Sequence, residues 1–358
     1  MGVRQLSEKP ASERIKDDEE LLQILEKAKT NIKVVGTGGA GNNTITRLMQ
    51  VGIVGAETVA VNTDAQDLLY TDAHKKILIG KETTRGLGAG ANPDVGMEAA
   101  KENKEDVKRA LQGADMIFLT AGLGGGTGTG SAPVIAEIAK KLGALTVAIV
   151  TLPFSMEGKH RMENAKRGLE NLQSVTDTLI VIPNDRLLEI VPDVSIATAF
   201  KVCDEILVNA VKGITEMVTK PGLVNLDFAD LRAVMQSGGL AMIGVGESDS
   251  ENRAFEAVER ALNNPLLTVS IDGAKNALIN VIGGTDITIK ESQQIAEAVS
   301  SRLAPDAKII WGVQIDKSLG NTIKALIVAT GLESQVIGGK AKKRKDIESI
   351  LGIEFVEE

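Results

Sequence analysis

The sequence predicts an α/β protein with a Rossmann-like domain on a parallel sheet, a long central helix and a smaller α/β C-terminal domain. Apolar strand-like runs alternate with helical patterns, which is typical of a parallel sheet covered by helices on both faces. One uninterrupted helical pattern, at residues 194–220, divides the chain. At ~100–200 residues per domain, a chain of 358 residues has room for about two domains.

The strands expected in the first domain are short apolar runs that end in glycine or polar residues. Helical patterns at 95–112 and 132–143 separate some of them. The second pattern has Pro133 near its first turn and Gly143 near its end. The strands are expected at 32–36, 58–64, 75–80, 114–122, 145–153 and 178–185.

Pro221 and Gly222 end the long helical pattern, and the alternation then continues. A helix is expected at 251–263, and strands follow it. The expected organisation is an N-terminal extension at 1–30, a nucleotide-binding domain at 31–195, a linking helix at 196–221, a C-terminal domain at 222–332 and a flexible tail at 333–358.

The composition excludes several classes of protein. The net charge of −8 disfavours binding to nucleic acid or to an anionic membrane. Cys203 is the only cysteine, so the chain has no intrachain disulfide or cysteine zinc cluster, which fits a reducing cytoplasm. The longest uncharged run, 116–136, is rich in Gly and Thr and makes no convincing membrane span. The N-terminus is charged throughout, unlike a signal peptide.

Four loops rich in glycine, Asn or Asp follow expected strands, at 36–43, 62–66, 86–93 and 122–133. In an open parallel sheet, loops at the carboxyl ends of the strands line one crevice, where ligands bind. Such loops suit phosphate, because their N–H groups point inward and the following helix N-terminus adds partial positive charge. For any one loop, the alternative is a tight turn between strand and helix.

The loop at 122–133 has more glycine than a turn needs. Glycine loses more conformational freedom on folding than other residues, so such a run works against stability. We interpret it as a backbone cradle for phosphates, in which side chains would block the ligand. Its candidate contacts are Gly124, Gly125, Gly126, Thr127, Gly128 and Thr129, with the threonines as hydroxyl donors.

The first loop leaves the kind of nucleotide open. Gly36, Gly38 and Gly41 form a G-x-G-x-x-G pattern after a strand, and Asp64 ends the next strand. Alone, this fingerprint suggests NAD and an oxidoreductase. Such an enzyme commonly uses a histidine as acid or base, but neither histidine lies in the C-terminal region. No G-x-x-x-x-G-K-[ST] pattern occurs, which disfavours a P-loop NTPase.

The joint pattern of motifs resembles the tubulin/FtsZ family, which includes the prokaryotic tubulin-like cell-division GTPases. The motifs are GTGGAGNN, NTDAQ, GAGANP, GGGTGTGSAP, PFSMEGKHR and NLDFAD, in this order, within about residues 31–332. The resemblance implies a domain that binds GTP or GDP, a long central helix, a C-terminal domain that carries a catalytic loop, and head-to-tail filaments.

The resemblance also implies the phosphate contacts. They fall on Gly39, Ala40, Gly41, Asn42, Asn43, Gly126, Thr127 and Gly128, with Ala91 and Asn92 by the γ-phosphate. Gly38 and Asp64, from the fingerprint, complete this set.

At the other end of the nucleotide, the resemblance implies that Glu157 and Arg161 contact ribose and phosphate. Phe200 would stack on guanine, and Asp204 would accept hydrogen bonds from its N1–H and N2 amine. A carboxylate matches that donor edge and repels the N1 acceptor of adenine. From the residues alone, the first two are an exposed i,i+4 pair, and Asp204 is a solvated helix position.

The motif NLDFAD supplies the expected catalytic residues, Asn225, Asp227 and Asp230. From spacing alone, the two aspartates share a face of a helical turn, and one caps a helix N-terminus. The resemblance implies instead that this loop enters the crevice of the next subunit and positions the attacking water. Hydrolysis would then require assembly. Mg²⁺ is expected on the GTP phosphates and water, without a metal site made of protein side chains.

The expected partner is the chain itself, in filaments that form a cytoplasmic ring at midcell. No nucleic acid and no direct membrane insertion are expected, whereas membrane-tethering adaptors and regulators could bind the tail. The tail residues IESILGIEFVEE resemble the usual adaptor-binding peptide only loosely, and AKKRKD is a solvated linker or a contact for acidic lipid. There are two alternatives: a role outside cell division, and polymerisation without turnover of the nucleotide.

Overall fold

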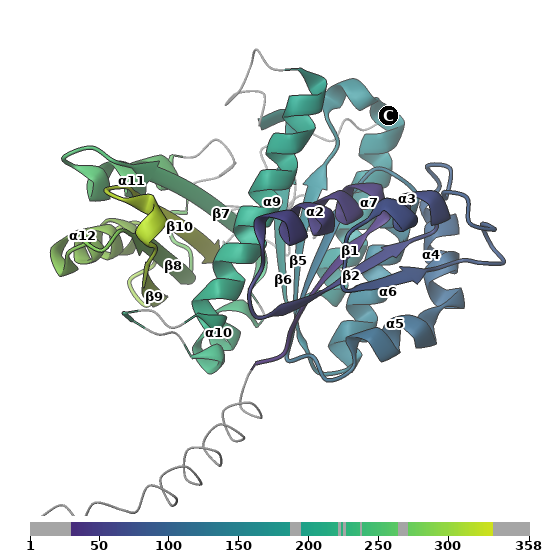
Figure 1. The fold of residues 1–358 in the computed structure, drawn as a ribbon, viewed down its shortest axis with the longest axis horizontal. Coiled ribbons are helices and arrows are strands. Elements are labelled where there is room, and N and C mark those ends of the chain that lie inside the picture. The colour runs from purple at the N-terminus through teal and green to yellow at the C-terminus, as the bar shows by residue number, and fades with distance from the viewer. Residues whose placement is uncertain are drawn as a thin grey trace, which may run out of the picture.

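The computed structural model describes residues 30–186, 195–220, 223–224, 227–236, 238–263 and 271–331. The expected tail and nearly all of the expected N-terminal extension lie outside these residues, as does the predicted helix end at Pro221 and Gly222. Figure 1 shows helix α9 (Ile196–Thr219) between an N-terminal and a C-terminal domain. The predicted long helix is therefore confirmed over these residues.

The N-terminal domain is built on parallel strands in the order β3-β2-β1-β4-β5-β6. Strands β1, β4, β5 and β6 are buried along nearly their whole length, as expected when helices cover both faces of a sheet. The predicted parallel α/β sheet is confirmed. Its strands are β1 (Ile32–Thr37), β2 (Ala56–Asn62), β3 (Lys75–Leu78), β4 (Met116–Gly122), β5 (Leu145–Leu152) and β6 (Thr178–Pro183).

Helices on the two faces bury separate cores. On one face, α2 (Gly38–Val51) and α9 pack on the sheet. On the other face, the core lies under α4 (Pro93–Glu102), α5 (Lys104–Leu111), α6 (Thr127–Lys141) and α7 (Lys159–Val175). The short elements α3 (Ala65–Tyr70) and η1 (Ser155–Glu157) follow β2 and β5.

The C-terminal domain has a mixed sheet in the order β7-β10-β8-β9, in which only β8 and β9 run parallel. Strand β7 also pairs with β6, so the two sheets form one ten-stranded sheet. The elements are α10 (Phe228–Met235), β7 (Gly239–Ser248), α11 (Arg253–Leu262), β8 (Asn276–Gly283), α12 (Ile289–Ser300), β9 (Lys308–Ile315), η2 (Lys317–Leu319) and β10 (Ile323–Thr330).

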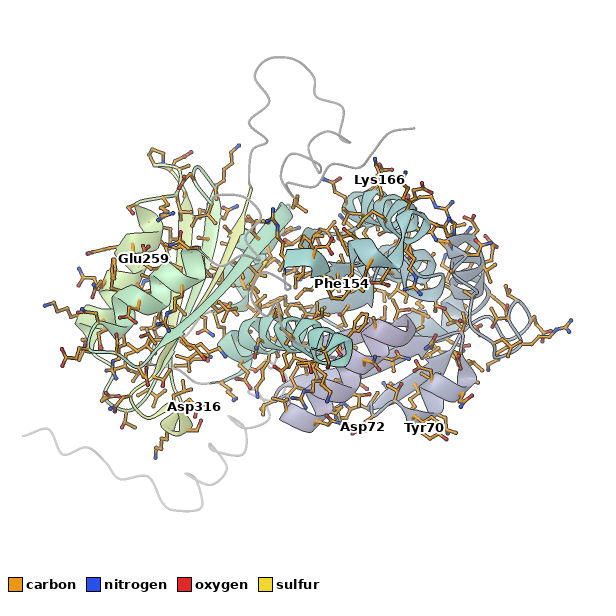
Figure 2. All side chains as sticks on the ribbon, turned by 90° about the horizontal axis from the view of Figure 1, so that it is seen from above. Tyr70, Asp72, Phe154, Lys166, Glu259 and Asp316 are labelled. Atoms are coloured by element: carbon orange, nitrogen blue, oxygen red, sulfur yellow. The ribbon has the colours of Figure 1, made fainter. Side chains whose placement is uncertain are left out.

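Helix α9 belongs to the core of both domains. Its Leu207 and Val211 share one apolar cluster with Ile149 of β5 and with Leu278 and Leu326 of the C-terminal sheet. Figure 2 shows the two domains on either side of α9, with Glu259 and Asp316 on one and Tyr70 and Lys166 on the other. The helix therefore fixes the distance between groups placed at its two ends.

The predicted start of the helix at 132–143 is wrong. Helix α6 begins at Thr127, so the second half of the glycine-rich loop is helical and Pro133 lies inside the helix. The physical reason is close packing. A Cβ atom at Gly130 would overlap the carbonyl oxygen of Pro93 on α4. Contact between the two helices therefore outweighs the poor helix propensity of glycine.

The single helical stretch predicted at 95–112 is two helices, α4 and α5. The break falls at Asn103, whose side-chain oxygen accepts a hydrogen bond from the Gly80 N–H at 2.9 Å. This tertiary bond ties the break to the end of β3. No helix within the described ranges has the length and apolar character needed to cross a membrane.

Candidate functional site

A cavity of about 360 Å³ lies at the carboxyl edge of the N-terminal parallel sheet. Of the four loops predicted to converge, those at 36–43, 86–93 and 122–133 contribute to its wall, whereas the loop at 62–66 supplies no lining residue. The other walls come from the residues after β5 and β6, from α7 and from α9. The lining residues are Gly38, Gly39, Ala40, Ala91, Gly122, Leu123, Gly125, Gly126, Thr127, Gly128, Thr151, Pro153, Glu157, Arg161, Asn184, Phe200, Cys203, Asp204 and Leu207.

Helices α2 and α6 both begin at this cavity. Thr37, before the first turn of α2, makes no side-chain capping bond among the described residues. Gly126, before the first turn of α6, has no side chain that could make one. The first N–H groups of both helices are therefore available to a ligand. Together with the partial positive charge of a helix N-terminus, they form a site for an anion such as phosphate.

Hydroxyl contacts hold these two helix starts in place. The hydroxyls of Thr37 and Ser131 share a hydrogen bond at 2.6 Å, and those of Thr63 and Thr127 share one at 2.7 Å. Thr129 accepts a hydrogen bond from the Gly124 N–H at 2.9 Å and is buried. These hydrogen bonds fix the positions of the two helix starts and of Gly124 relative to one another.

The interpretation that all glycines at 122–130 keep side chains away from a ligand is wrong in part. A Cβ atom at Gly125 would meet no described atom within 4 Å, so this position does face open space. At Gly126, however, a Cβ atom would lie 2.7 Å from the Ala89 methyl group, and at Gly128 it would lie 2.9 Å from the Gly122 oxygen. Most of this run therefore allows backbone segments to pack closely.

Phe200 and Asp204, the residues expected to contact guanine, lie on the first half of α9. Phe200 is 43% exposed and packs edge-to-face on Phe154, with ring centroids 5.3 Å apart. Asp204 lines the cavity and is half-buried, so the alternative of a solvated helix position is wrong. Burial raises the pKa of Asp204 to about 6, against the opposing effects of the Thr44 hydroxyl and Arg47. Burial likewise raises the pKa of the Cys203 thiol to about 12, so it packs here as a neutral side chain.

Glu157 of η1 and Arg161 of α7 form another part of the cavity wall. They form the i,i+4 ion pair that spacing alone predicts, at 2.6 Å, and both line the cavity. Glu157 also accepts a hydrogen bond from the Phe154 N–H at 2.9 Å. The pair is therefore held at the cavity wall and presents a guanidinium to an anionic ligand.

Asn184 is a candidate site residue that the sequence interpretation missed. It is 5% exposed and lines the cavity, yet its Oδ1 has no hydrogen-bond partner among the described residues. A buried acceptor without a partner favours a ligand that donates a hydrogen bond. Asn184 directly follows β6, so the rule that ligands bind beyond the carboxyl ends of strands could have found it.

Several predicted residues do not line the cavity. Asp64 and Asn92 cap α3 and α4, accepting hydrogen bonds from Gln66 and Asp94 N–H groups. Asn42 is buried and donates to Asp67 at 3.1 Å. Of the described residues, the wall does not include Gly41, Asn42, Asn43, Asp64, Asn92, Gly124 or Thr129.

The expected catalytic residues lie away from this cavity. Asp227 caps α10 through a 2.9 Å hydrogen bond from the Ala229 N–H, as spacing alone predicts, and Asp230 follows in the first turn. Both are exposed. Arg232 of the same helix donates to the carbonyl oxygen of Asp115, just before β4. Helix α10 is thus at the amino edge of the sheet, opposite the cavity. Asn225 lies outside the described residues.

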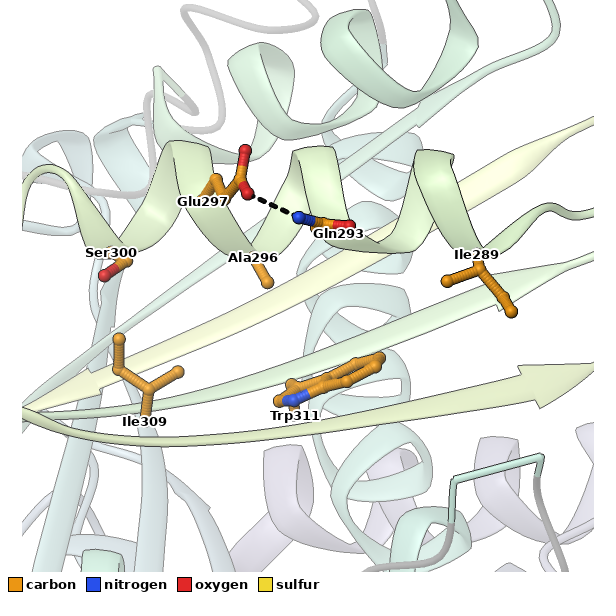
Figure 3. A pocket seen from close by; sticks show the side chains of 7 residues that line it. All are labelled: Ile289, Gln293, Ala296, Glu297, Ser300, Ile309 and Trp311. Atoms are coloured by element: carbon orange, nitrogen blue, oxygen red, sulfur yellow. Dashed lines mark hydrogen bonds between the residues drawn. The ribbon is translucent and has the colours of Figure 1, made fainter.

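A second cavity, of about 390 Å³, lies in the C-terminal domain between α12 and β9. Figure 3 shows Trp311 and Ile309 of β9 facing Ala296 and Ile289 of α12. None of its described lining residues is a glycine, and the start of α12 beside it is already capped by Thr288 and Glu291. Its chemistry does not suit a phosphate, so the first cavity is the candidate nucleotide site.

The parallel sheet, the two helix N-termini at one cavity and the long helix leading to a mixed-sheet domain define a tubulin-like GTPase. Residues 31–192 match the description "Tubulin/FtsZ family, GTPase domain", and residues 239–333 match "FtsZ family, C-terminal domain". The chain belongs to the tubulin/FtsZ family. The resemblance carried by its motifs is confirmed, and the chain is a GTPase rather than an NAD-dependent oxidoreductase.

The matches to known relatives cover most of the chain. Cell division protein FtsZ 1 of Methanocaldococcus jannaschii is 62% identical over 93% of this chain and 92% of that protein. Its counterpart in Thermococcus kodakarensis is 64% identical over 88% of this chain and 85% of that protein. A solved FtsZ dimer of M. jannaschii, 64% identical, has a TM-score of 0.85 and covers 89% of this chain and 93% of that chain. CetZ2 of Haloferax volcanii, 22% identical, has a TM-score of 0.74 over 90% of this chain and 97% of that chain, and shares the fold.

Proposed function

We propose that this protein binds GTP in the glycine-lined cavity and hydrolyses it to GDP and phosphate between successive subunits of a head-to-tail filament. We further propose that these filaments form the division ring at midcell in the cytoplasm. The names of the relatives, which are cell division proteins, support this role. Adaptors that tether the filament would bind the tail, which lies outside the described residues.

The chemistry of the cavity supports one orientation of GTP. The triphosphate would lie at the N-termini of α2 and α6, with Gly125 and Thr127 close to it. Arg161 would contact the ribose and a phosphate. Guanine would stack on Phe200, with its N1–H and N2 amine donating to Asp204. The unpartnered oxygen of Asn184 would accept a further hydrogen bond from the nucleoside.

One observation carries the split active site: the cavity and the NLDFAD carboxylates lie at opposite ends of α9. Asp204 is in the first half of the helix, and Asp227 follows its far end. At 1.5 Å per residue, the 15 residues from Asp204 to Thr219, where α9 ends, span about 22 Å. Asp227 therefore cannot reach the nucleotide of its own subunit, whereas an exposed carboxylate at one end can enter the cavity of a neighbour.

Exposed apolar side chains at both ends of the subunit support such a contact. Leu87 and Met156, in the loops beside the cavity, are 71% and 72% exposed. Leu223, close to the Asp227 loop, is 65% exposed, and its N–H bonds to Val313 of β9. Two different apolar ends suit a heterologous contact, and a heterologous contact that does not close generates an open filament.

In this arrangement, Asp227 and Asp230 of one subunit would orient and polarise a water against the γ-phosphate of the next. Mg²⁺, when bound, would offset the charge of the phosphates as these carboxylates approach. Within the described ranges, no group of three His, Cys, Asp or Glu side chains could hold a metal ion. In this proposal the phosphates and water hold it, as is usual for Mg²⁺.

The test is phosphate release from GTP across a range of protein concentrations, with light scattering recorded alongside. If the sites are shared, activity per molecule is near zero at low concentration and rises with scattering above a threshold. Constant activity per molecule without scattering would place all catalytic groups within one chain. Scattering without phosphate release would indicate a polymer that does not turn over its nucleotide.

A further inference from the structure

Asn164 of α7 lies where three segments of the nucleotide cavity meet, although it is not on the cavity wall. It is 8% exposed. Its amide nitrogen donates to the main-chain oxygen of Ala91 at 2.9 Å and lies 3.5 Å from the oxygen of Gly124. The first belongs to the loop before α4, the second to the loop before α6. One buried side chain thus joins both loops to the helix that carries Arg161.

The bond to Ala91 holds a strained part of the backbone. Ala91 has a φ of 58°, in the left-handed region that a residue with a Cβ atom rarely adopts. The peptide unit after it is held from both sides, because the Asn92 N–H donates to the Ala89 oxygen at 3.0 Å. Left-handed backbone is unfavourable in a residue other than glycine, because the Cβ atom comes too close to the following carbonyl oxygen. The Asn164 hydrogen bond offsets part of this cost.

The same loop packs tightly on the phosphate loop. A Cβ atom at Gly126 would lie 2.9 Å from the Asn92 nitrogen, so nothing larger than glycine fits between the two loops. A Cβ atom at Gly124 would lie 2.9 Å from the Arg161 oxygen, so the phosphate loop also rests on α7. A change in the Ala91 peptide would therefore alter both the wall near Ala91 and the α6 helix start.

We propose that Asn164 is a positioning residue that holds the Ala91 loop in the shape that accepts the third phosphate of GTP. The inference rests on the proposed function, in which Ala91 lies beside the γ-phosphate. GDP has no group at that position. Asn164 therefore contributes to the preference for GTP over GDP rather than to binding of the nucleotide in general.

The chemistry requires an amide at this position. A carbonyl oxygen needs a donor, and asparagine supplies an N–H without a charge that burial would penalise. Aspartate has nearly the same volume, but its carboxylate would face the oxygens of Ala91 and Gly124. The nearby ion pair of Arg167 with Asp94, at 3.0 Å, joins α7 to α4. This pair is exposed, so it contributes little to holding the Ala91 loop in place.

The experiment measures the affinities of a non-hydrolysable GTP analogue and of GDP, below the concentration at which the protein assembles. Asn164→Ala is expected to lower the affinity for the GTP analogue by about fivefold, since a typical hydrogen bond contributes ~1 kcal/mol. The affinity for GDP is expected to stay nearly unchanged. Asn164→Asp is expected to lower the affinity for the GTP analogue further than Asn164→Ala does. Asn171→Ala, an exposed asparagine of the same helix, is the matched control. Circular dichroism confirms that each variant is folded.

The outcomes separate the inference from the proposed function. An unchanged ratio of the two affinities in Asn164→Ala overturns the inference, as does an equal loss for both nucleotides. If the unsubstituted protein does not bind the GTP analogue, the proposed function fails whatever Asn164 does. Adding Ala91→Gly to Asn164→Ala is expected to recover part of the GTP preference, because glycine adopts this backbone without strain. No recovery would contradict the role given to the Ala91 peptide.

Discussion

Arg232 donates a hydrogen bond to the main-chain oxygen of Asp115 at 3.3 Å, and this contact anchors α10 at the amino edge of the N-terminal sheet. The same guanidinium lies 5.2 Å from the centre of the Phe228 ring. Gly122, at the other end of strand β4, lines the nucleotide cavity. The seven residues of β4 span about 20 Å. A buried strand therefore separates the candidate catalytic carboxylates from the nucleotide of the same subunit.

Asp227→Ala is expected to keep GTP binding and to lose GTP turnover by ~10²-fold or more, the scale seen when a preorganised polar group is removed. The physical reason is that this carboxylate would act only on a nucleotide held by the neighbouring subunit. Phosphate release and equilibrium GTP binding are the two measurements. Asp249→Ala, at an exposed position in the C-terminal domain, is the control. Normal turnover in Asp227→Ala would remove this residue from the mechanism.

Asp227→Ala lacks a proposed catalytic carboxylate and Arg161→Ala lacks a proposed nucleotide contact, so each is expected to be inactive alone, and mixing them tests whether the site is shared. Asp227→Ala keeps an intact cavity, and Arg161→Ala keeps an intact catalytic loop. In an equal mixture of copolymerising subunits, about a quarter of the contacts would combine both intact halves. Phosphate release should therefore reappear on mixing, at up to about a quarter of the unsubstituted rate. Two inactive variants that stay inactive, although light scattering shows copolymers, would argue for a site within one chain.

Asp204→Ala is expected to weaken GTP binding by about tenfold to a hundredfold, because hydrogen bonds to a charged group contribute ~1.5–3 kcal/mol. It should also reduce the preference for GTP over ATP, since the carboxylate repels the adenine N1 acceptor. Competition between the two nucleotides measures this preference. Glu205→Ala, the neighbouring exposed carboxylate, should leave the preference unchanged. An intact preference in Asp204→Ala would show that another group reads the base.

The raised pKa of Asp204, to about 6, predicts opposite effects of pH on binding and stability. Guanine needs the charged carboxylate, so GTP affinity should fall as the pH falls through about 6. Because the pKa is higher in the folded state, the burial penalty is present above that pH and is relieved on acidification. The nucleotide-free Asp204→Asn protein should therefore melt at a higher temperature than the unsubstituted protein near pH ~7.5, with a smaller difference near pH ~5.

Titrations of GTP affinity and of melting temperature against pH, for both proteins, check this prediction. The variant should lack the step in affinity near pH 6 that Asp204 gives the unsubstituted protein. The same step in both proteins would assign it to another group.

Two glycine substitutions separate packing from ligand binding in the same loop. Gly130→Ala is expected to destabilise the fold by ~1–3 kcal/mol, because its methyl group would overlap the Pro93 oxygen. Gly125→Ala has free space and should change the free energy of unfolding by less than ~0.5 kcal/mol. It should nevertheless weaken GTP binding, since the methyl group would project into the cavity. Denaturant unfolding without nucleotide, followed by GTP binding, measures both effects. Equal stability losses would contradict this division of roles.

Much of the fold could be predicted from local patterns. The strands at 116–122 and 145–152 are mostly apolar and almost entirely buried because both faces of the sheet are covered. The start of α6 could not be predicted, because it depends on the contact of Gly130 with Pro93, which is not a neighbour in sequence. The position of Asn184 after a strand could have marked it as a candidate, but the sequence did not show how its side chain is paired. Its importance lies in an unpartnered oxygen, and spacing does not show which polar atoms find partners.

By itself, the sequence determined the order of strands and helices, the glycine-bearing loops after the strands and the family to which the chain belongs. These are local properties, since periodicity, glycine content and motif order can be read along the chain. Only the tertiary structure decided that Asp204 is half-buried, that Asn164 joins two loops and that Asp227 lies across the sheet from the cavity. The physical reason is that burial and distance arise from the packing of segments far apart in sequence, which residue spacing does not encode.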